Sequence, residues 1–288
     1  MKKVIFISML MFFCSVVLAQ DFSSLFEAAL QKKLDISDEY IDKGQEFSWV
    51  FVTGFLNEGA GWVGRYFGDN RDRLKTYVPG EEIYILRPSS TNSIETNAVI
   101  LLKQLQEIYE RHHKKIIVIA HSKGSPETLK MLANEPKTTA QSIQAVLTIQ
   151  AAFGSQVADF LAGDCPFGME GLKSLTIQEV DRIFSSEVVQ VLKKHVVPIY
   201  FLRTSQKIGG EGNSVALGIL ATAKYLSSYG ENDGLVTVER QKLSGVGIDL
   251  GIINADHADT VLEPPSSNTP SGFRAALMDA IFFYLMSR

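Results

Sequence analysis

The chain has 288 residues, a formal net charge of −4 at pH 7 and a hydrophobic content of 45%. A chain of this length and composition can bury a substantial core, as one large α/β domain or as two small ones. No basic stretch of the kind that binds nucleic acid stands out, so we do not expect a nucleic-acid partner.

The N-terminal segment differs from the rest of the chain. Lys2 and Lys3 precede an apolar run from Val4 to Leu18, which closes on Ala19. This pattern is typical of a secretory signal peptide. A transmembrane helix needs about 20 apolar residues, so a retained anchor fits less well. We therefore predict cleavage after Ala19, an exported (periplasmic or secreted) protein without an integral membrane span, and a single domain over 20–288.

Cys165 is the only cysteine that remains after this cleavage. A single cysteine cannot form an internal disulfide, so the stability of the exported chain must come from its core. The surrounding sequence, GDCPFGM, supplies no basic partner for catalysis. We interpret Cys165 as a structural or incidental thiol.

Hydrophobic patterning predicts the secondary structure of the mature chain. The expected elements, in chain order, are a polar, helix-prone segment at 21–46, strands at Phe47–Gly54 and Ile83–Pro88, a helix from Ile94 to Tyr109, a strand at Ile116–Ala120, a helix near Pro126–Ala133, strands at Ala145–Ile149, Val196–Leu202 and about Val246–Ile253, and a C-terminal helix at 273–286. Continuous apolar strands that alternate with helices indicate a mostly parallel sheet covered on both faces.

Two segments interrupt this alternation. Residues 151–194 hold helical patterns without a good strand, and 205–229 begin with a glycine-rich loop. Insertions after the strands of an open α/β sheet lie over its carboxyl edge, where ligands bind. We therefore predict a helical cap or lid at about 151–195. Four apolar side chains in this segment recur at helical spacing and either line an acyl pocket or pack within the cap: Phe153, Val157, Phe160 and Leu161.

The strand that ends at Ala120 leads directly into His121, Ser122, Lys123 and Gly124, and then into a helix. A sharp turn between a buried strand and a helix strains its central residue and needs small neighbours. This arrangement resembles the nucleophile elbow of the α/β-hydrolases, with Ser122 at its apex and Ala120 where glycine is more common. The alternative is that Ser122 only caps the helix.

A serine nucleophile needs a base, and the five histidines differ in position. His112 and His113 lie in a charged helix end, where we expect them to be solvated. His121 neighbours the nucleophile, but its side chain should point away around the turn. His195 precedes a strand and so lies at the amino edge of the sheet. His257 follows the last strand, at the carboxyl edge, and is the predicted base; a helix-capping role is the alternative.

The base in turn needs a carboxylate, which in α/β-hydrolases lies between the serine and the histidine in chain order. Asp233, followed by glycine and an apolar run, is the predicted acid, although an Asp-Gly pair is also a common turn. Glu231 is kept as the alternative acid. Asp249 and Asp259 are weaker competitors, and Asp256 adjoins the histidine too closely to face its ring.

Hydrolysis also needs two backbone N–H groups that stabilise the developing oxyanion. One should come from Lys123, directly after the nucleophile. The other should come from Phe55, because Gly54 lets the backbone approach the serine closely. Many α/β-hydrolases have histidine before that glycine, whereas Thr53 stands here. Since the donor belongs to the backbone, this difference leaves an oxyanion hole possible, and Gly124 supports it by keeping the elbow small.

Taken together, the chain resembles the α/β-hydrolase family, and within it the lipase and esterase-like branch, from about Trp49 to Thr260. The segments that carry the resemblance are GWVGRYFGDN, AHSKGSPETL, LTIQAAFGSQVADFL, NDGLV and DHADTV. It implies an α/β-hydrolase fold, an acyl-enzyme intermediate, a small-molecule or lipid ester as substrate, and no metal or organic cofactor. An amidase or a thioesterase on the same fold, or a non-catalytic hydrolase-like binding protein, stays open.

Overall fold

The computed structural model describes residues 21–55, 65–164, 169–206, 217–262, 269–270 and 272–288. The predicted signal peptide and Cys165 lie outside these ranges. Among the described residues, no helix combines the length and the apolar character that crossing a membrane requires.

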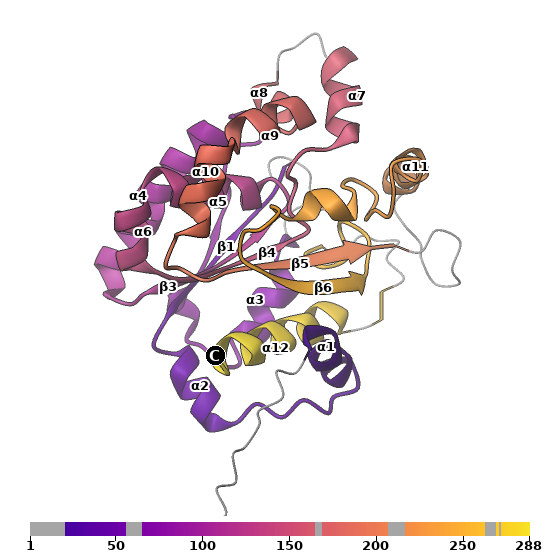
Figure 1. Ribbon diagram of the computed structural model, residues 1–288. Coiled ribbons are helices and arrows are strands. Elements are labelled where there is room, and N and C mark those ends of the chain that lie inside the picture. Colours follow the sequence, from indigo (N-terminus) through magenta and orange to yellow (C-terminus); the bar gives the residue numbers. More distant parts are fainter. Residues whose placement is uncertain (1–20, 56–64, 165–168, 207–216, 263–268, 271) are drawn as a thin grey trace, which may run out of the picture.

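A six-stranded sheet, parallel throughout, forms the centre of the described structure (Figure 1). Its strands are β1 (Ser48–Val52), β2 (Ile83–Leu86), β3 (Ile116–His121), β4 (Ile143–Ile149), β5 (Ile199–Ser205) and β6 (Ile248–Asn254), in the order β2-β1-β3-β4-β5-β6. The chain reverses its direction of travel across the sheet after β2. The carboxyl ends of β1 and β3 therefore flank the switch point at which open α/β sheets bind ligands.

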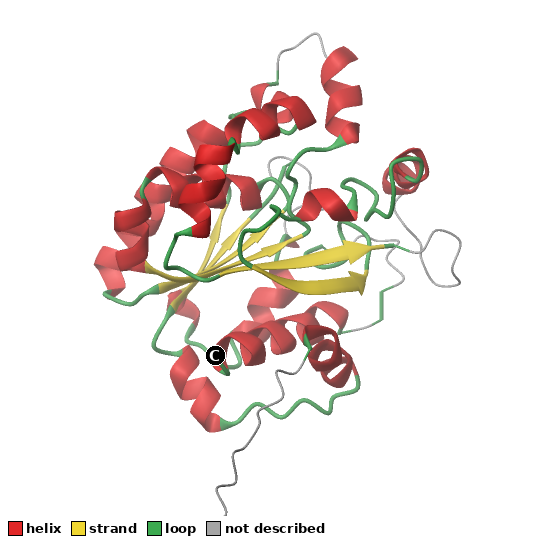
Figure 2. Cartoon of the chain, in the orientation of Figure 1, coloured by secondary structure: helices red, strands yellow, loops and turns green. Residues whose placement is uncertain are grey.

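Helices cover both faces of the sheet (Figure 2), so the predicted parallel arrangement is confirmed. One face carries α1 (Phe22–Leu30), α2 (Asp38–Gly44), α3 (Gly68–Leu74) and α12 (Phe273–Met286). The other carries α4 (Ile94–His112), α5 (Gly124–Asn134), α6 (Pro136–Ser142) and α10 (Ser186–Lys193). Each face has its own hydrophobic core, which explains why the central strands are apolar on both sides.

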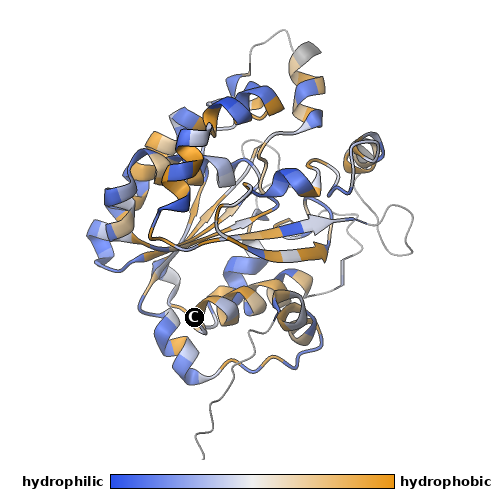
Figure 3. Cartoon of the chain, in the orientation of Figure 1, coloured by the Kyte–Doolittle hydropathy of each residue, from blue (hydrophilic) through white to orange (hydrophobic). Residues whose placement is uncertain are grey.

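α12 and α4 show two ways of covering a sheet. α12 is apolar over most of its surface (Figure 3) because it lies between the sheet and the outer helices α1 and α3. α4 buries only one stripe, and the side chain of Ser93 caps its start by accepting a hydrogen bond from the Thr96 N–H. The residue that caps its C-terminal end, His113, adopts a left-handed conformation with φ 54°.

Most predicted boundaries agree with the structure to within two residues, and differences of three residues occur at the end of α4 and at both ends of β5. This strand begins at Ile199 and not at Val196, whose surface is 77% exposed. The intervening Pro198 has no N–H to donate to a neighbouring strand, so the strand begins after it and runs on to Ser205, three residues beyond the predicted end.

Among its described residues, the segment between β4 and β5 holds four helices, α7 (Gln156–Asp164), α8 (Glu170–Lys173), α9 (Ile177–Ile183) and α10. α10 packs against α5, so this end of the segment belongs to the layer that covers the sheet. α7 instead meets α11 (Leu217–Leu226), where the rings of Phe160 and Tyr225 lie 6.0 Å apart. The extent of a cap at about 151–195 stays a prediction.

Candidate active site

Three side chains from distant parts of the chain form one hydrogen-bonded row. The Ser122 hydroxyl donates to Nε2 of His257 over 2.9 Å, and Nδ1 of His257 donates to Oδ2 of Asp233 over 2.7 Å. With Asp233 ionised, the carboxylate can only accept, so Nδ1 carries the ring proton and Nε2 is left to accept from serine. Ser122 follows β3, Asp233 precedes β6 and His257 follows it. The structure thus brings together the three side chains selected from the sequence.

Ser122 occupies a strained turn between β3 and α5. Its φ of 52° lies in the left-handed region, which is uncommon for a residue with a side chain. The turn is also sterically tight, since a Cβ on Gly124 would lie 2.6 Å from the Thr53 carbonyl oxygen. The N-cap position of α5 belongs to Lys123 and not to Ser122. The alternative role of Ser122 as a helix cap therefore does not describe the structure.

Asp233 is fully buried and surrounded by donors. Its Oδ1 accepts from the N–H groups of Leu235 and Val236, and its Oδ2 accepts from Gln241 as well as from the imidazole. The N–H of His257 also donates to the Asp233 carbonyl over 2.8 Å. These bonds hold the ionised carboxylate and the imidazole in a fixed relation. The Asp-Gly turn also exists, with Gly234 at φ 101°, and it aims the carboxylate at the ring.

The competing acids are exposed or are engaged elsewhere. Glu231 is exposed, and Asp249 forms an ion pair with Arg203 on the neighbouring strand. Asp256 accepts from the backbone N–H groups of Ala258 and Asp259 within the histidine loop. Burial raises the pKa of Asp256 to about 6.

The remaining histidines differ in part from expectation. His195 lies at the amino edge, where its Nε2 contacts the Thr139 hydroxyl at 3.0 Å. His113 is exposed, but His112 is half-buried against the Tyr84 hydroxyl, so its expected solvation was wrong. A helix that packs onto an edge strand buries side chains that its charged sequence does not mark.

The loop after β1 approaches the nucleophile closely. A Cβ on Gly54 would lie 2.6 Å from Cβ of Ser122, so only glycine fits this position without displacing its neighbours. Within the described ranges, the backbone N–H groups of Phe55 and Lys123 donate to no protein acceptor. Both predicted oxyanion donors thus directly follow a residue of the nucleophile site, Gly54 or Ser122, and neither has an acceptor in the part of the chain that the structure describes.

The side chain of Lys123 turns away from this site into the protein. It is 1% exposed, and its Nζ donates to Glu127 and, over 2.9 Å, to the Asn92 carbonyl. Glu127 also accepts from the Asn97 amide at 2.7 Å. Burial raises the pKa of Glu127 to about 7, although Lys123 acts in the opposite direction. This pair joins the first turn of α5 to the loop before α4.

Three further buried side chains lie beneath the site and were not selected from the sequence. They are Tyr66, His121 and Gln150, exposed by 4%, 2% and 0%. The His121 ring lies 4.9 Å from the His257 ring, so its contact with the base was missed. Gln150 carried one signal, because it is a polar residue directly after a buried strand. Tyr66 lies in GWVGRYFGDN, one of the segments that carry the family resemblance, but no local pattern in that segment marks the tyrosine as a contact of His121.

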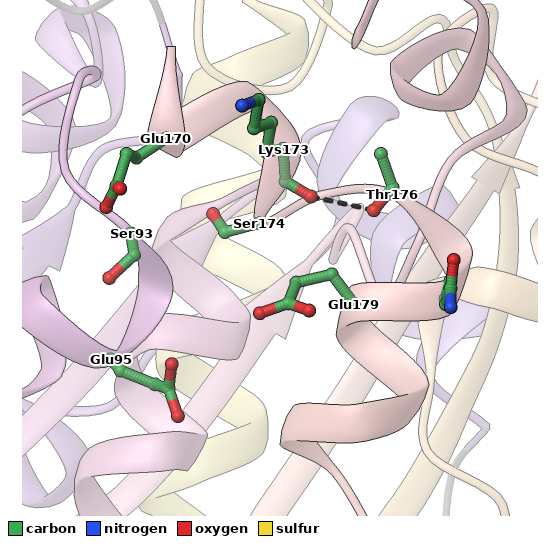
Figure 4. A pocket seen from close by; sticks show the side chains of 8 residues that line it. Ser93, Glu95, Glu170, Lys173, Ser174, Thr176 and Glu179 are labelled. Atoms are coloured by element: carbon green, nitrogen blue, oxygen red, sulfur yellow. Dashed lines mark hydrogen bonds between the residues drawn. The ribbon is translucent and has the colours of Figure 1, made fainter. Parts of the chain in front are cut away.

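A separate open pocket of about 450 Å³ lies between the start of α4 and helices α8 and α9 (Figure 4). It is lined by Ser93, Glu95, Glu170, Lys173, Ser174, Thr176, Gln178 and Glu179. It shares no residue with the Ser122 row. In the part of the chain that the structure describes, no group of three or more His, Cys, Asp or Glu side chains is placed to hold a metal ion.

Comparisons with known proteins bear on the fold of this chain. A family model described as lecithin:cholesterol acyltransferase matches residues 93–210. The metagenomic carboxyl esterase MGS0156 is similar over 85% of this chain and 77% of its own, with a TM-score of 0.64 and 23% identity. Bacillus licheniformis lipase BlEst2, in its mature form, is similar over 74% of this chain and 85% of its own, with a TM-score of 0.58 and 22% identity.

A third solved structure, phospholipase PlaB from Legionella pneumophila, has a TM-score of 0.51 and 17% identity, covering 68% of this chain and 45% of its own. Among curated proteins, none matches this chain. The fold is the α/β-hydrolase fold, as predicted, and the resemblance to lipase and esterase-like α/β-hydrolases is confirmed.

Proposed function

We propose that this protein is a serine hydrolase of carboxylic esters, of the lipase or esterase kind, that acts through an acyl-enzyme intermediate. The observation that carries the proposal is the hydrogen-bonded row Ser122–His257–Asp233 with its nucleophile on a strained turn. A capped helix or a polar core cluster would not require this strain. The α/β-hydrolase fold and the family match over 93–210 support the same class.

In the proposed reaction, the Ser122 oxygen attacks the ester carbonyl while Nε2 of His257 removes its proton. The backbone N–H groups of Phe55 and Lys123 stabilise the oxyanion of the tetrahedral intermediate. Asp233 stabilises the imidazolium that forms. The imidazolium then protonates the leaving alcohol, which departs and leaves the acyl group on the serine. A water molecule, activated by the same imidazole, releases the carboxylic acid and restores the hydroxyl.

The substrate proposed is a lipid or a medium-chain ester. Phe153 and Val157 are buried, but Phe160 and Leu161 on α7 expose 62% and 46% of their surfaces. The two exposed side chains lie on the helix that follows β4, on the carboxyl side of the sheet where the serine lies. This apolar surface supports an acyl chain as the part of the substrate that lies there.

The test is ester hydrolysis by the wild type and by Ser122→Ala. We expect the variant to lose activity by a factor on the order of 10⁴ to 10⁶ in kcat. Ser125→Ala is the matched control, because Ser125 is also buried, at the start of α5 just after the turn, but donates to the Ala120 carbonyl. A Ser122→Ala variant within tenfold of the wild type would overturn the proposal.

Nitrophenyl esters of increasing acyl length, with amide and thioester analogues beside them, identify the bond and the chain preferred. Strict preference for acetate would contradict the lipid proposal, and faster cleavage of the amide or thioester would identify the alternative hydrolases. A fluorophosphonate probe that fails to label Ser122 would favour a non-catalytic binding protein.

We also propose that the protein is exported, because Lys2, Lys3 and the apolar run from Val4 to Leu18 form a signal-peptide pattern. Expression of the full chain in a bacterial host, followed by N-terminal sequencing, tests this directly. Export predicts a mature chain that starts at Gln20 in the extracytoplasmic fraction. An intact chain that starts at Met1 in the cytoplasm would contradict it.

A further inference from the structure

A second hydrogen-bonded row runs beneath the candidate active site and takes no direct part in the proposed chemistry. The Tyr66 hydroxyl lies 2.9 Å from the Gly54 nitrogen and 2.5 Å from Nδ1 of His121. On the other side of the ring, Nε2 of His121 lies 2.9 Å from Oε1 of Gln150 and 3.0 Å from the His257 carbonyl oxygen. The row thus reaches from the loop after β1 to the loop after β6.

The donors and acceptors of this row have a single consistent direction. The His257 carbonyl oxygen can only accept, so in a neutral ring Nε2 of His121 donates to it, and Nδ1 accepts from the Tyr66 hydroxyl, whose oxygen accepts from the Gly54 N–H. Nδ1 is then an acceptor, and the ring proton resides on Nε2, which donates to the Gln150 and His257 oxygens. This assignment needs a neutral imidazole. Burial lowers the pKa of His121 well below its usual range, which agrees with it.

Both ends of the row hold parts that the proposed reaction uses. Gly54 directly precedes Phe55, whose N–H is an oxyanion donor, and the space around Gly54 is closed by the Tyr66 hydroxyl and by Ser122. At the other end, the His257 carbonyl belongs to the residue whose ring is the base. Gln150 also donates to the Asp256 carbonyl over 2.6 Å, so the same layer holds the histidine loop at two points.

We propose that Tyr66 and His121 are positioning residues. They hold the loop after β1, which carries Phe55, and the loop after β6, which carries His257, at a fixed separation around Ser122. An oxyanion donor must lie about 2.7–3.1 Å from the position that the oxyanion will occupy. A displacement of about 1 Å at a reacting group lowers the rate on the order of 100-fold. A bridge that is buried, fully hydrogen-bonded and attached to the backbone of both loops provides this constraint.

This inference rests on the proposed ester hydrolysis, and the experiment compares Tyr66→Phe with Tyr77→Phe. Tyr77 is the matched control because it too is a buried tyrosine whose hydroxyl is hydrogen-bonded, in this case to Asp279 over 2.9 Å, away from the site. We expect Tyr66→Phe to lower kcat by about 10- to 100-fold with KM within about threefold of the wild type. Tyr77→Phe should lower Tm while kcat stays at the wild-type value.

A second measurement tests the connection through the imidazole. In a His121→Leu background the Tyr66 hydroxyl has lost its acceptor, so Tyr66→Phe should lower kcat by less than twofold further. If His121→Leu does not fold, the comparison of Tyr66→Phe with Tyr77→Phe still tests the positioning role.

The outcomes separate the two proposals. A Tyr66→Phe variant with wild-type kcat, or one whose KM rises while kcat is unchanged, overturns the positioning role and leaves ester hydrolysis standing. Equal kcat losses in Tyr66→Phe and Tyr77→Phe also overturn it, because a general loss of packing would explain both. A wild-type protein that hydrolyses no ester overturns the proposed function, and the inference fails with it.

Discussion

Replacing Gly124 by alanine tests how closely the nucleophile turn is packed against β1. The new Cβ would lie 2.6 Å from the Thr53 carbonyl oxygen and 2.9 Å from the Val52 carbonyl oxygen. Ordinary contact begins at 3.4 Å, so the turn must move away from β1 by about 0.8 Å. Two of the three obstructing atoms are backbone carbonyl oxygens at the end of β1, so rotation of the Val52 side chain, which supplies the third, cannot relieve the clash.

This movement separates the two oxyanion donors, because Phe55 continues from β1 whereas Lys123 belongs to the turn. We expect kcat to fall on the order of 100-fold for a displacement of this size, and the free energy of unfolding to fall by about 1–3 kcal/mol. The assays are steady-state hydrolysis of a nitrophenyl ester and urea unfolding of the same preparation.

Gly44→Ala is the control for a substitution that lowers stability but leaves activity unchanged. Its Cβ would lie 2.5 Å from the Phe282 ring, which is stacked on the Trp49 ring in the core beneath the opposite face of the sheet. We expect a similar loss of unfolding free energy with kcat unchanged. The reasoning is refuted if Gly124→Ala retains wild-type kcat, or if Gly44→Ala loses as much kcat as Gly124→Ala does.

Three further predictions concern single side chains. Asp233→Asn should lower kcat on the order of 10⁴-fold with little change in the fold, because an amide that donates to His257 favours the wrong tautomer; steady-state kinetics and circular dichroism check this. The folded state raises the pKa of Glu127 from 4.5 to about 7, so the stability contributed by its protonated form is fully present below about pH 4.5 and is lost as the pH rises to about 7. Glu127→Gln should therefore show a weaker decline in unfolding free energy over this interval, and an unchanged decline in urea titrations would exclude Glu127 as its source. Phe160→Ser replaces a side chain that is 62% exposed, so it should change stability by less than about 0.5 kcal/mol. It should lower the rate of hydrolysis of long acyl esters but not of acetate esters; if the substitution changes both rates by the same factor, α7 is not part of the substrate site.

The elements predicted correctly are those whose signal lies within a few consecutive residues. β3 begins with an unbroken apolar run, Ile116–Ala120, that leads through His121 to Ser122 and Gly124, and this local pattern is enough to place the strand, the turn and Ser122. His257 was found from its position after the last strand, since the ends of parallel strands meet at one edge. Errors occur where the neighbours are distant in sequence, as at His112, which the edge strand β2 covers through Tyr84.

The sequence by itself determined the fold class and the order of nucleophile, acid and base, because strand periodicity and turn chemistry depend on adjacent residues. Only the tertiary structure decided that Asp233, and none of the nearby carboxylates, faces the imidazole at 2.7 Å. It alone also showed the Tyr66 and His121 row and the buried partner of Lys123. Such contacts depend on how separate segments pack, and burial and hydrogen-bond direction are properties of that packing that no short stretch of sequence contains.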